Sequence, residues 1–197
     1  MKKLILLVVV LAIGGFAAYK FFGKEEDKPR EEKPKPISLG EQSGAFHQSY
    51  ETLLDAYFAM KDAFVDGDTL KVNAAAAKLA AAAETLKVDE IAGDSTGIIK
   101  ETAKTYTGTI TGSALGLAGE QDIENKRKEL DMITDAVWTL TRTVKYEGQK
   151  IYYQKCPMAF ENKGAYWLSK ETAIRNPYFG KKMLTCGQTE DSLQYKN

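Results

Sequence analysis

The sequence has little histidine, little cysteine and no excess of charge. His47 is the one histidine among 197 residues, which excludes zinc sites and catalytic mechanisms that need two or more imidazoles. The 27 Lys and Arg residues balance the 27 Asp and Glu residues, so no net positive field attracts phosphate groups and we expect no nucleic-acid partner. We interpret His47 as a surface or boundary residue of a helix and not as a metal ligand.

The sequence also lacks the short motifs of several enzyme classes. It contains no Cys-x-x-Cys redox pair, no glycine-rich phosphate loop, no nucleophile elbow and no Glu-x-x-His pair for a carboxylate di-metal site. We therefore expect a binding or structural protein that is not an enzyme.

The N-terminus has the pattern of an export signal. Two lysines follow Met1, and an uncharged stretch runs from Leu4 to Tyr19. Counted on to Phe22, this stretch approaches the roughly 20 residues of a membrane-spanning helix. We predict that residues 1–23 are a signal anchor or a signal peptide, and we favour the uncleaved anchor. The remaining chain is then expected in the cell envelope, on the periplasmic side, either anchored to the inner membrane or secreted.

The next two segments differ sharply in composition. Residues 24–40 are charged and contain three of the five prolines, which is typical of an extended linker. In residues 41–148 the apolar side chains recur at helical spacing. We expect four helices there: from Ser43 to about Gly67, after an N-cap at Asp68 and fading by Ile91, from about Ser95 to Leu117, and from about Asp122 to Val144. Short connections favour an all-α fold, an antiparallel four-helix bundle.

A glycine ladder marks the third of these helices. Gly108, Gly112 and Gly116 are spaced four residues apart and therefore share one helical face. Because glycine lets two helix backbones approach closely, we interpret this face as a tight contact inside the bundle.

Residues 149–197 have no helical period. They begin with the β-prone run Ile151–Tyr153, and we expect an irregular or short β-hairpin tail packed on the bundle as part of the same domain. Four aromatic residues are candidates for the apolar cover by which this tail docks, or for a surface presented to a partner: Tyr166, Trp167, Tyr178 and Phe179.

All of the cysteine lies in this tail, and each cysteine has a methionine close by. Cys156 precedes Met158 by two residues, and Met183 precedes Cys186 by three. Thiolates and thioethers are the ligands that select monovalent copper or silver. These four residues are therefore a candidate site for Cu(I) or Ag(I).

A disulfide between Cys156 and Cys186 is the alternative. Two cysteines in an exported protein commonly pair, and closing this loop would stabilise the fold by roughly 3 to 4 kcal/mol in the chain-entropy account. The two methionines would then fill gaps in the core.

Several segments carry a family resemblance. In the tail they are Cys156 to Ala159, Gly164 to Ser169, Ile174 to Gly180, and Met183 with Cys186 and Gly187; in the helices they are Leu53, Leu54 and Tyr57, Ala63 to Asp66, and Ile123 and Glu124 ahead of Arg127. With these residues the chain resembles a bacterial domain family of unknown function that is common in Bacteroidetes and also occurs fused to CusB-type heavy-metal efflux adaptors.

The resemblance implies an envelope protein involved in handling copper or other soft metals, with heavy-metal efflux components as partners. One difference limits the comparison: efflux adaptors often continue Cys-Pro-Met with histidine, whereas Ala159 and Phe160 follow here. Two hypotheses result. In the first, a membrane-tethered protein binds Cu(I) or Ag(I) through Cys156, Met158, Met183 and Cys186. In the second, a non-catalytic interaction domain is stapled by a Cys156–Cys186 disulfide.

Overall fold

The structure, a computed structural model, describes Lys20 and residues 39–195. The predicted signal segment, residues 1–23, lies outside the described residues except for Lys20, as does nearly all of the predicted linker. The chain divides into two units, residues 1–36 and 37–197, and the following description concerns the second. Within the described residues, no helix has both the length and the apolar character needed to span a bilayer.

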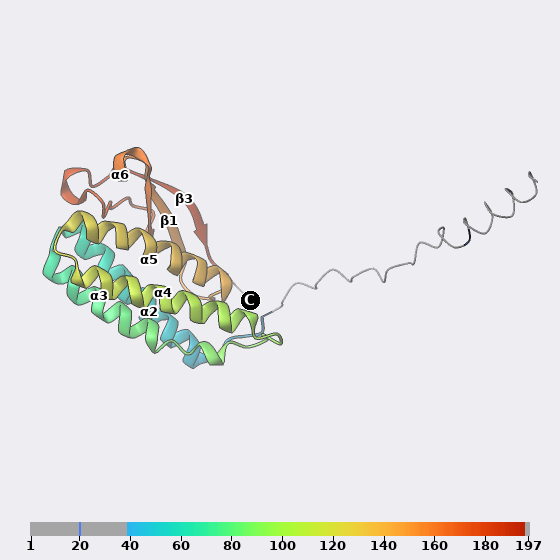
Figure 1. The fold of residues 1–197 in the computed structure, drawn as a ribbon. Helices are drawn as coiled ribbons and strands as arrows, with labels where there is room; N and C mark the ends of the chain where they lie inside the picture. Colours follow the sequence, from blue (N-terminus) through green and yellow to red (C-terminus); the bar gives the residue numbers. More distant parts are fainter. Residues whose placement is uncertain (1–19, 21–38, 196–197) are drawn as a thin grey trace, which may run out of the picture. The chain divides into compact units, whose positions relative to one another are not determined.

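Four long helices form most of this unit: α2 Gly44–Asp66, α3 Thr69–Glu84, α4 Ile98–Gly119 and α5 Ile123–Thr143. They lie side by side, and α3 contacts α2 while α4 contacts both α3 and α5 (Figure 1). The four helices predicted from the apolar spacing are confirmed. A short 3₁₀ helix, η1 Val88–Glu90, lies between α3 and α4.

Side-chain caps fix where three of the helices begin. The side chains of Ser43, Asp68 and Asp122 each accept a hydrogen bond from the backbone N–H three residues later, at 3.0, 3.0 and 3.2 Å. These bonds satisfy N–H groups that have no partner within the first turn. Gly67 ends α2 with a φ of +72°, a conformation that glycine adopts without steric cost.

The glycine ladder faces outward, so its interpretation as an internal contact is wrong. Gly108, Gly112 and Gly116 are exposed, and a Cβ atom added at Gly108 or Gly112 would meet nothing within 4 Å. The face of α4 that packs inside is built by a different set: Ala103, Thr107, Ile110, Ala114 and Leu117. The helix packs through alanine and the branched residues, and the glycines fall beside this stripe.

The tail forms a three-stranded antiparallel sheet in the order β2-β1-β3, where an irregular tail or a two-stranded hairpin was expected. Its strands are β1 Ile151–Cys156, β2 Ala165–Ser169 and β3 Gln188–Leu193. The additional strand β3 is polar and mostly exposed, so it carries no apolar alternation. Between the strands lie two short elements, α6 Ala159–Asn162 and η2 Gly180–Lys182.

One hydrophobic core joins the helices and the tail. It includes Trp167, Leu168 and Tyr178 from the tail together with the buried faces of the four helices. The sheet lies over α5, and β2 contacts both α5 and α2 (Figure 1). At the centre, the Tyr57 hydroxyl lies 2.7 Å from the Thr134 hydroxyl on α5 and accepts a hydrogen bond from the Leu168 N–H of β2 at 3.0 Å. The tail is thus part of the folded core.

Candidate functional site

The two cysteines meet at one end of the sheet. Cys156 is the last residue of β1 and is fully buried, whereas Cys186 lies just before β3 and is half-buried. Their sulfur atoms are 3.9 Å apart and both are free thiols. The distance exceeds the roughly 2.05 Å of a disulfide bond. Residues 30 positions apart in the chain thus form one dithiol site.

Strand pairing brings the second cysteine to the first. Lys155 is opposite Gln188 in the β1–β3 ladder, which places Cys186 beside Cys156 as the chain enters β3. Gly187 makes this approach possible. Its φ is +147°, and a Cβ atom there would lie 2.7 Å from both the Lys155 carbonyl oxygen and the Trp167 ring. Only glycine fits this close crossing of two chain segments.

Its surroundings make the Cys186 thiol a poor anion. The pKa of Cys186 is raised above its ordinary value by desolvation first, and then by the hydrogen bond and the charge interaction with Cys156. A metal cation that replaces the thiol protons would supply the positive charge that the site lacks, so binding would release protons and depend on pH. Among the residues that the structure describes, no group of three or more His, Cys, Asp or Glu side chains is placed to hold a metal ion. Sulfur is therefore the chemistry that this site offers.

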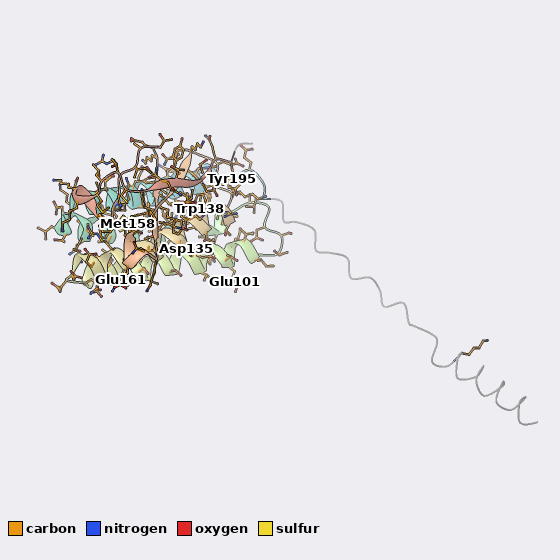
Figure 2. All side chains as sticks on the ribbon, turned by 90° about the horizontal axis from the view of Figure 1, so that it is seen from above. Glu101, Asp135, Trp138, Met158, Glu161 and Tyr195 are labelled. Carbon is orange, nitrogen blue, oxygen red and sulfur yellow. The ribbon has the colours of Figure 1, made fainter. Side chains whose placement is uncertain are left out.

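The two candidate methionine ligands lie in different settings. Met183 is half-buried, and its carbonyl accepts a hydrogen bond from the Cys186 N–H at 3.0 Å, so it belongs to the same turn as the second cysteine. Met158 is 45% exposed and lines a surface pocket of about 360 Å³ together with Arg127 and Phe179. It lies at the turn after β1 and is labelled in Figure 2. The structure brings the two thiols together and leaves the Met158 side chain open to solvent.

The turn after β1 has an unusual backbone. Phe160, Glu161 and Asn162 have φ values of +51°, +59° and +69°, so α6 contains a left-handed turn. Each such residue costs about 1 to 2 kcal/mol relative to the right-handed form. The turn separates Met158 from the next strand and forms one wall of its pocket.

The predicted aromatic cover is divided between core and rim. Trp167 and Tyr178 are buried, at 0% and 3% exposure, so they dock the tail and are closed to a partner, whereas Tyr166 and Phe179 are half-buried. The Tyr178 hydroxyl donates to the Tyr166 carbonyl and lies 3.4 Å from Asp131 on α5.

Sequence reasoning missed several residues of this region. The Asp131 carboxylate accepts a hydrogen bond from the Tyr166 N–H at 3.0 Å, and the rings of Trp138, Tyr153 and Tyr166 form a parallel stack with centroids 4.7 and 4.6 Å apart. Neither could be found from spacing, because the contacts cross from a helix to a sheet. The place of Asn176 before Pro177 is a signal in the sequence that points to a side-chain-capped turn.

His47 lies in the first turn of α2. It is half-buried, with its ring 6.0 Å from that of Tyr146 and 6.3 Å from that of Phe46. It lies at the edge of the aromatic core, which agrees with its interpretation as a boundary residue.

Residues 53–148 match the family described as protein of unknown function (DUF3347). The match begins within α2, ends after α5 and supports a relationship to a domain family without an assigned function. The tail that carries the two cysteines, and the tail segments of the resemblance noted above, lie outside the matched residues. No curated protein and no solved structure matches the chain.

Proposed function

We propose that this protein binds a soft monovalent metal ion, Cu(I) or Ag(I), at the Cys156–Cys186 pair and acts as a non-catalytic metal-handling module. The observation that carries the proposal is the 3.9 Å separation of the two thiols. Two thiolates bound to one ion at about 2.3 Å, the zinc–thiolate distance, lie roughly 3.8 Å apart at a tetrahedral angle and roughly 4.6 Å apart in a linear arrangement. The site therefore needs little movement to accept an ion.

The donor set favours a soft ion over zinc. Zinc sites in proteins usually have four ligands, or three and a water molecule, whereas soft thiolate and thioether donors select Cu(I). Met183 shares a turn with Cys186, and Met158 follows Cys156 by two residues. In the proposal these two thioethers complete the ligand set, and Met158 turns inward from its exposed position.

The proposal also includes a cellular setting. We propose that the four long helices form an antiparallel bundle that serves as a rigid base for the tail. The N-terminal segment tethers this domain to the inner membrane on the periplasmic side, and the partners are heavy-metal efflux components. The sequence resemblance described above, to a bacterial family that also occurs fused to CusB-type adaptors, is the support for this part of the proposal.

An anaerobic titration of residues 37–197 with Cu(I) or Ag(I) tests the function. One equivalent should bind tightly in the presence of reductant, with release of thiol protons. The double variant Cys156→Ser/Cys186→Ser should lose the site. Met158→Leu and Met183→Leu should each weaken binding and leave the fold intact, because Leu and Met have similar volumes. Equal affinity of the wild type and the cysteine-free variant would exclude the proposal.

The same sulfur distance supports a second function, a disulfide-stapled interaction domain. Counting free thiols before and after exposure to air distinguishes the two. Loss of both thiols in a monomeric product without any metal binding by the reduced form favours the disulfide. Tight binding by the reduced form favours the metal.

A further inference from the structure

Asn176 reaches from the turn after β2 to the cysteine loop. Its side chain is fully buried, and its amide nitrogen donates to the Cys186 carbonyl at 2.8 Å. Its backbone N–H donates to the Leu184 carbonyl at 2.8 Å. Two hydrogen bonds from one residue thus hold the short loop that carries the second thiol.

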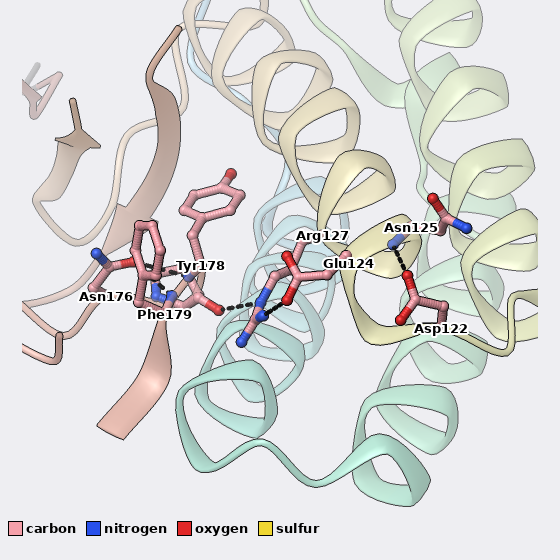
Figure 3. Close-up of polar contacts among 8 residues, drawn as sticks. Asp122, Glu124, Asn125, Arg127, Asn176, Tyr178 and Phe179 are labelled. Atoms are coloured by element: carbon pink, nitrogen blue, oxygen red, sulfur yellow. Dashed lines mark hydrogen bonds and ion pairs between the residues drawn. The ribbon is translucent and has the colours of Figure 1, made fainter. Parts of the chain in front are cut away.

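The opposite side of the Asn176 side chain holds the turn itself. Its oxygen accepts hydrogen bonds from the N–H groups of Tyr178 and Phe179 at 2.8 and 3.4 Å, as Figure 3 shows. A hydrogen bond fixes this turn to α5: the Arg127 guanidinium donates to the Pro177 carbonyl at 3.2 Å (Figure 3). The amide therefore connects a loop that faces the first thiol to a turn that is anchored on a helix.

We infer that Asn176 is the positioning residue of the Cys156–Cys186 site. It acts through the backbone of Cys186 and touches neither sulfur. Hydrogen bonds have defined distances and directions, and breaking the bond from the buried Asn176 amide removes a fixed link to the Cys186 backbone. Loss of the amide donor frees the Cys186 loop to move away from Cys156, which is itself fixed as part of β1. The inference deepens the proposed function and rests on it for its biological meaning.

Asn176→Asp removes the donor of this side chain and keeps its acceptor. The aspartate keeps the oxygen that accepts from Tyr178 and Phe179, but it places a second oxygen against the Cys186 carbonyl in place of the amide donor. The turn should remain and the loop should loosen. Asn176→Ala removes both donor and acceptor and should have the larger effect.

The first readout is the equilibrium constant for forming the Cys156–Cys186 disulfide from the dithiol, measured by exchange with oxidised and reduced dithiothreitol. The dithiol gives up two electrons and two protons to the oxidised reagent, and the equilibrium constant reports how closely the protein holds its thiols. Asn176→Asp should lower this constant by about tenfold, in line with the loss of one hydrogen bond from a buried amide. The second readout is Ag(I) affinity, which should fall by a similar factor.

Two control variants separate positioning from stability. Asn125→Asp makes the same chemical change on the far side of Arg127, at the start of α5 (Figure 3), and should leave the constant unchanged. Thr141→Val removes the buried partner of the Tyr50 hydroxyl and should lower the melting temperature without changing the dithiol equilibrium.

The outcomes are distinct. A lower constant in Asn176→Asp, together with wild-type constants in both controls, supports the inference. A lower melting temperature with an unchanged constant would overturn it, as would a wild-type protein whose thiols never pair. If the wild type binds no metal but Asn176→Asp still lowers the constant, the metal function fails while the positioning role of Asn176 stands.

Discussion

Single residues decide how closely the tail segments approach one another. Gly187 packs against the backbone of β1 and the Trp167 ring with no room for a side chain, and it directly follows Cys186. Backbone atoms of a paired strand cannot retreat as a flexible side chain can. We therefore expect this contact to affect the local stability of the tail.

Gly187→Ala should destabilise the domain by about 2 kcal/mol, because the new methyl group meets the Lys155 carbonyl and the backbone is forced from its favoured conformation. Urea denaturation measures the loss. Gly112→Ala is the matched control, since a Cβ there meets nothing within 4 Å and alanine favours helix by about 1 kcal/mol. It should leave the domain as stable or more stable. An equal effect of the two changes would contradict the close approach at Gly187.

Ionisation of the Asp131 carboxyl, between α5 and the tail, is unfavourable in the folded protein. Burial is the main cause that raises the pKa of this carboxyl, the charge of Asp135 adds to it, and hydrogen bonds from Tyr166 and Tyr178 oppose it. Since its pKa is higher in the folded than in the unfolded state, the folded protein binds this proton more tightly. Ionised Asp131 therefore opposes folding above its folded pKa, and the penalty disappears as the pH falls through that value.

Asp131→Asn should accordingly raise the free energy of unfolding at neutral pH, because the amide oxygen can still accept from the Tyr166 N–H. The advantage over the wild type should shrink as the pH is lowered towards 3.8, the ordinary pKa of Asp. Chemical denaturation of both proteins across this range measures the difference. A constant difference at every pH would show that the charge of Asp131 is not its cause.

At the scale of elements, the helices follow from local chemistry and the sheet does not. Ser43, Asp68 and Asp122 lie at the helix starts because their side chains bind the N–H groups of the first turn, a signal that is visible in sequence. The strand Gln188–Leu193 has no such signal, because it is polar and owes its conformation to pairing with β1. The two cysteines could be proposed as partners from their type, but the part played by Asn176 needed the fold.

The helices and the tail are connected most directly through Tyr57. Tyr57→Phe should cost about 2 kcal/mol, because it leaves the buried N–H of Leu168 and the hydroxyl of Thr134 without this partner. Tyr50→Phe is the matched change. The Tyr50 hydroxyl is hydrogen-bonded to the Thr141 hydroxyl, which keeps its own bond to the Val137 carbonyl, so the cost should be about 1 kcal/mol or less. Thermal and urea unfolding measure both, and a larger loss in Tyr50→Phe would contradict this account.

At the scale of the whole unit, the family match ends at residue 148 but the hydrophobic core continues past it. A helical part that shares its core with the sheet should not unfold independently of it. The family match therefore covers only part of the folded unit, which continues into the tail after residue 148.

Residues 37–197 should unfold in a single transition. Trp138→Phe leaves Trp167, which lies in β2, as the one tryptophan, so its fluorescence follows the tail while far-ultraviolet circular dichroism follows the helices. The two midpoints of the same variant should coincide in urea. Separate midpoints would show that the tail folds as a unit of its own.

The stacked rings of Trp138, Tyr153 and Tyr166 give the docked tail an optical signature. The three planes are parallel to within 3° at each contact and close enough for their electronic transitions to mix. Light absorbed by one ring is then shared with its neighbours, and this exciton coupling in a fixed chiral setting produces near-ultraviolet circular dichroism. Because Trp138 belongs to α5 and Tyr153 to the sheet, the part of this signal that comes from Trp138 exists only while the two are joined. The stack is thus a built-in spectroscopic label for tail docking.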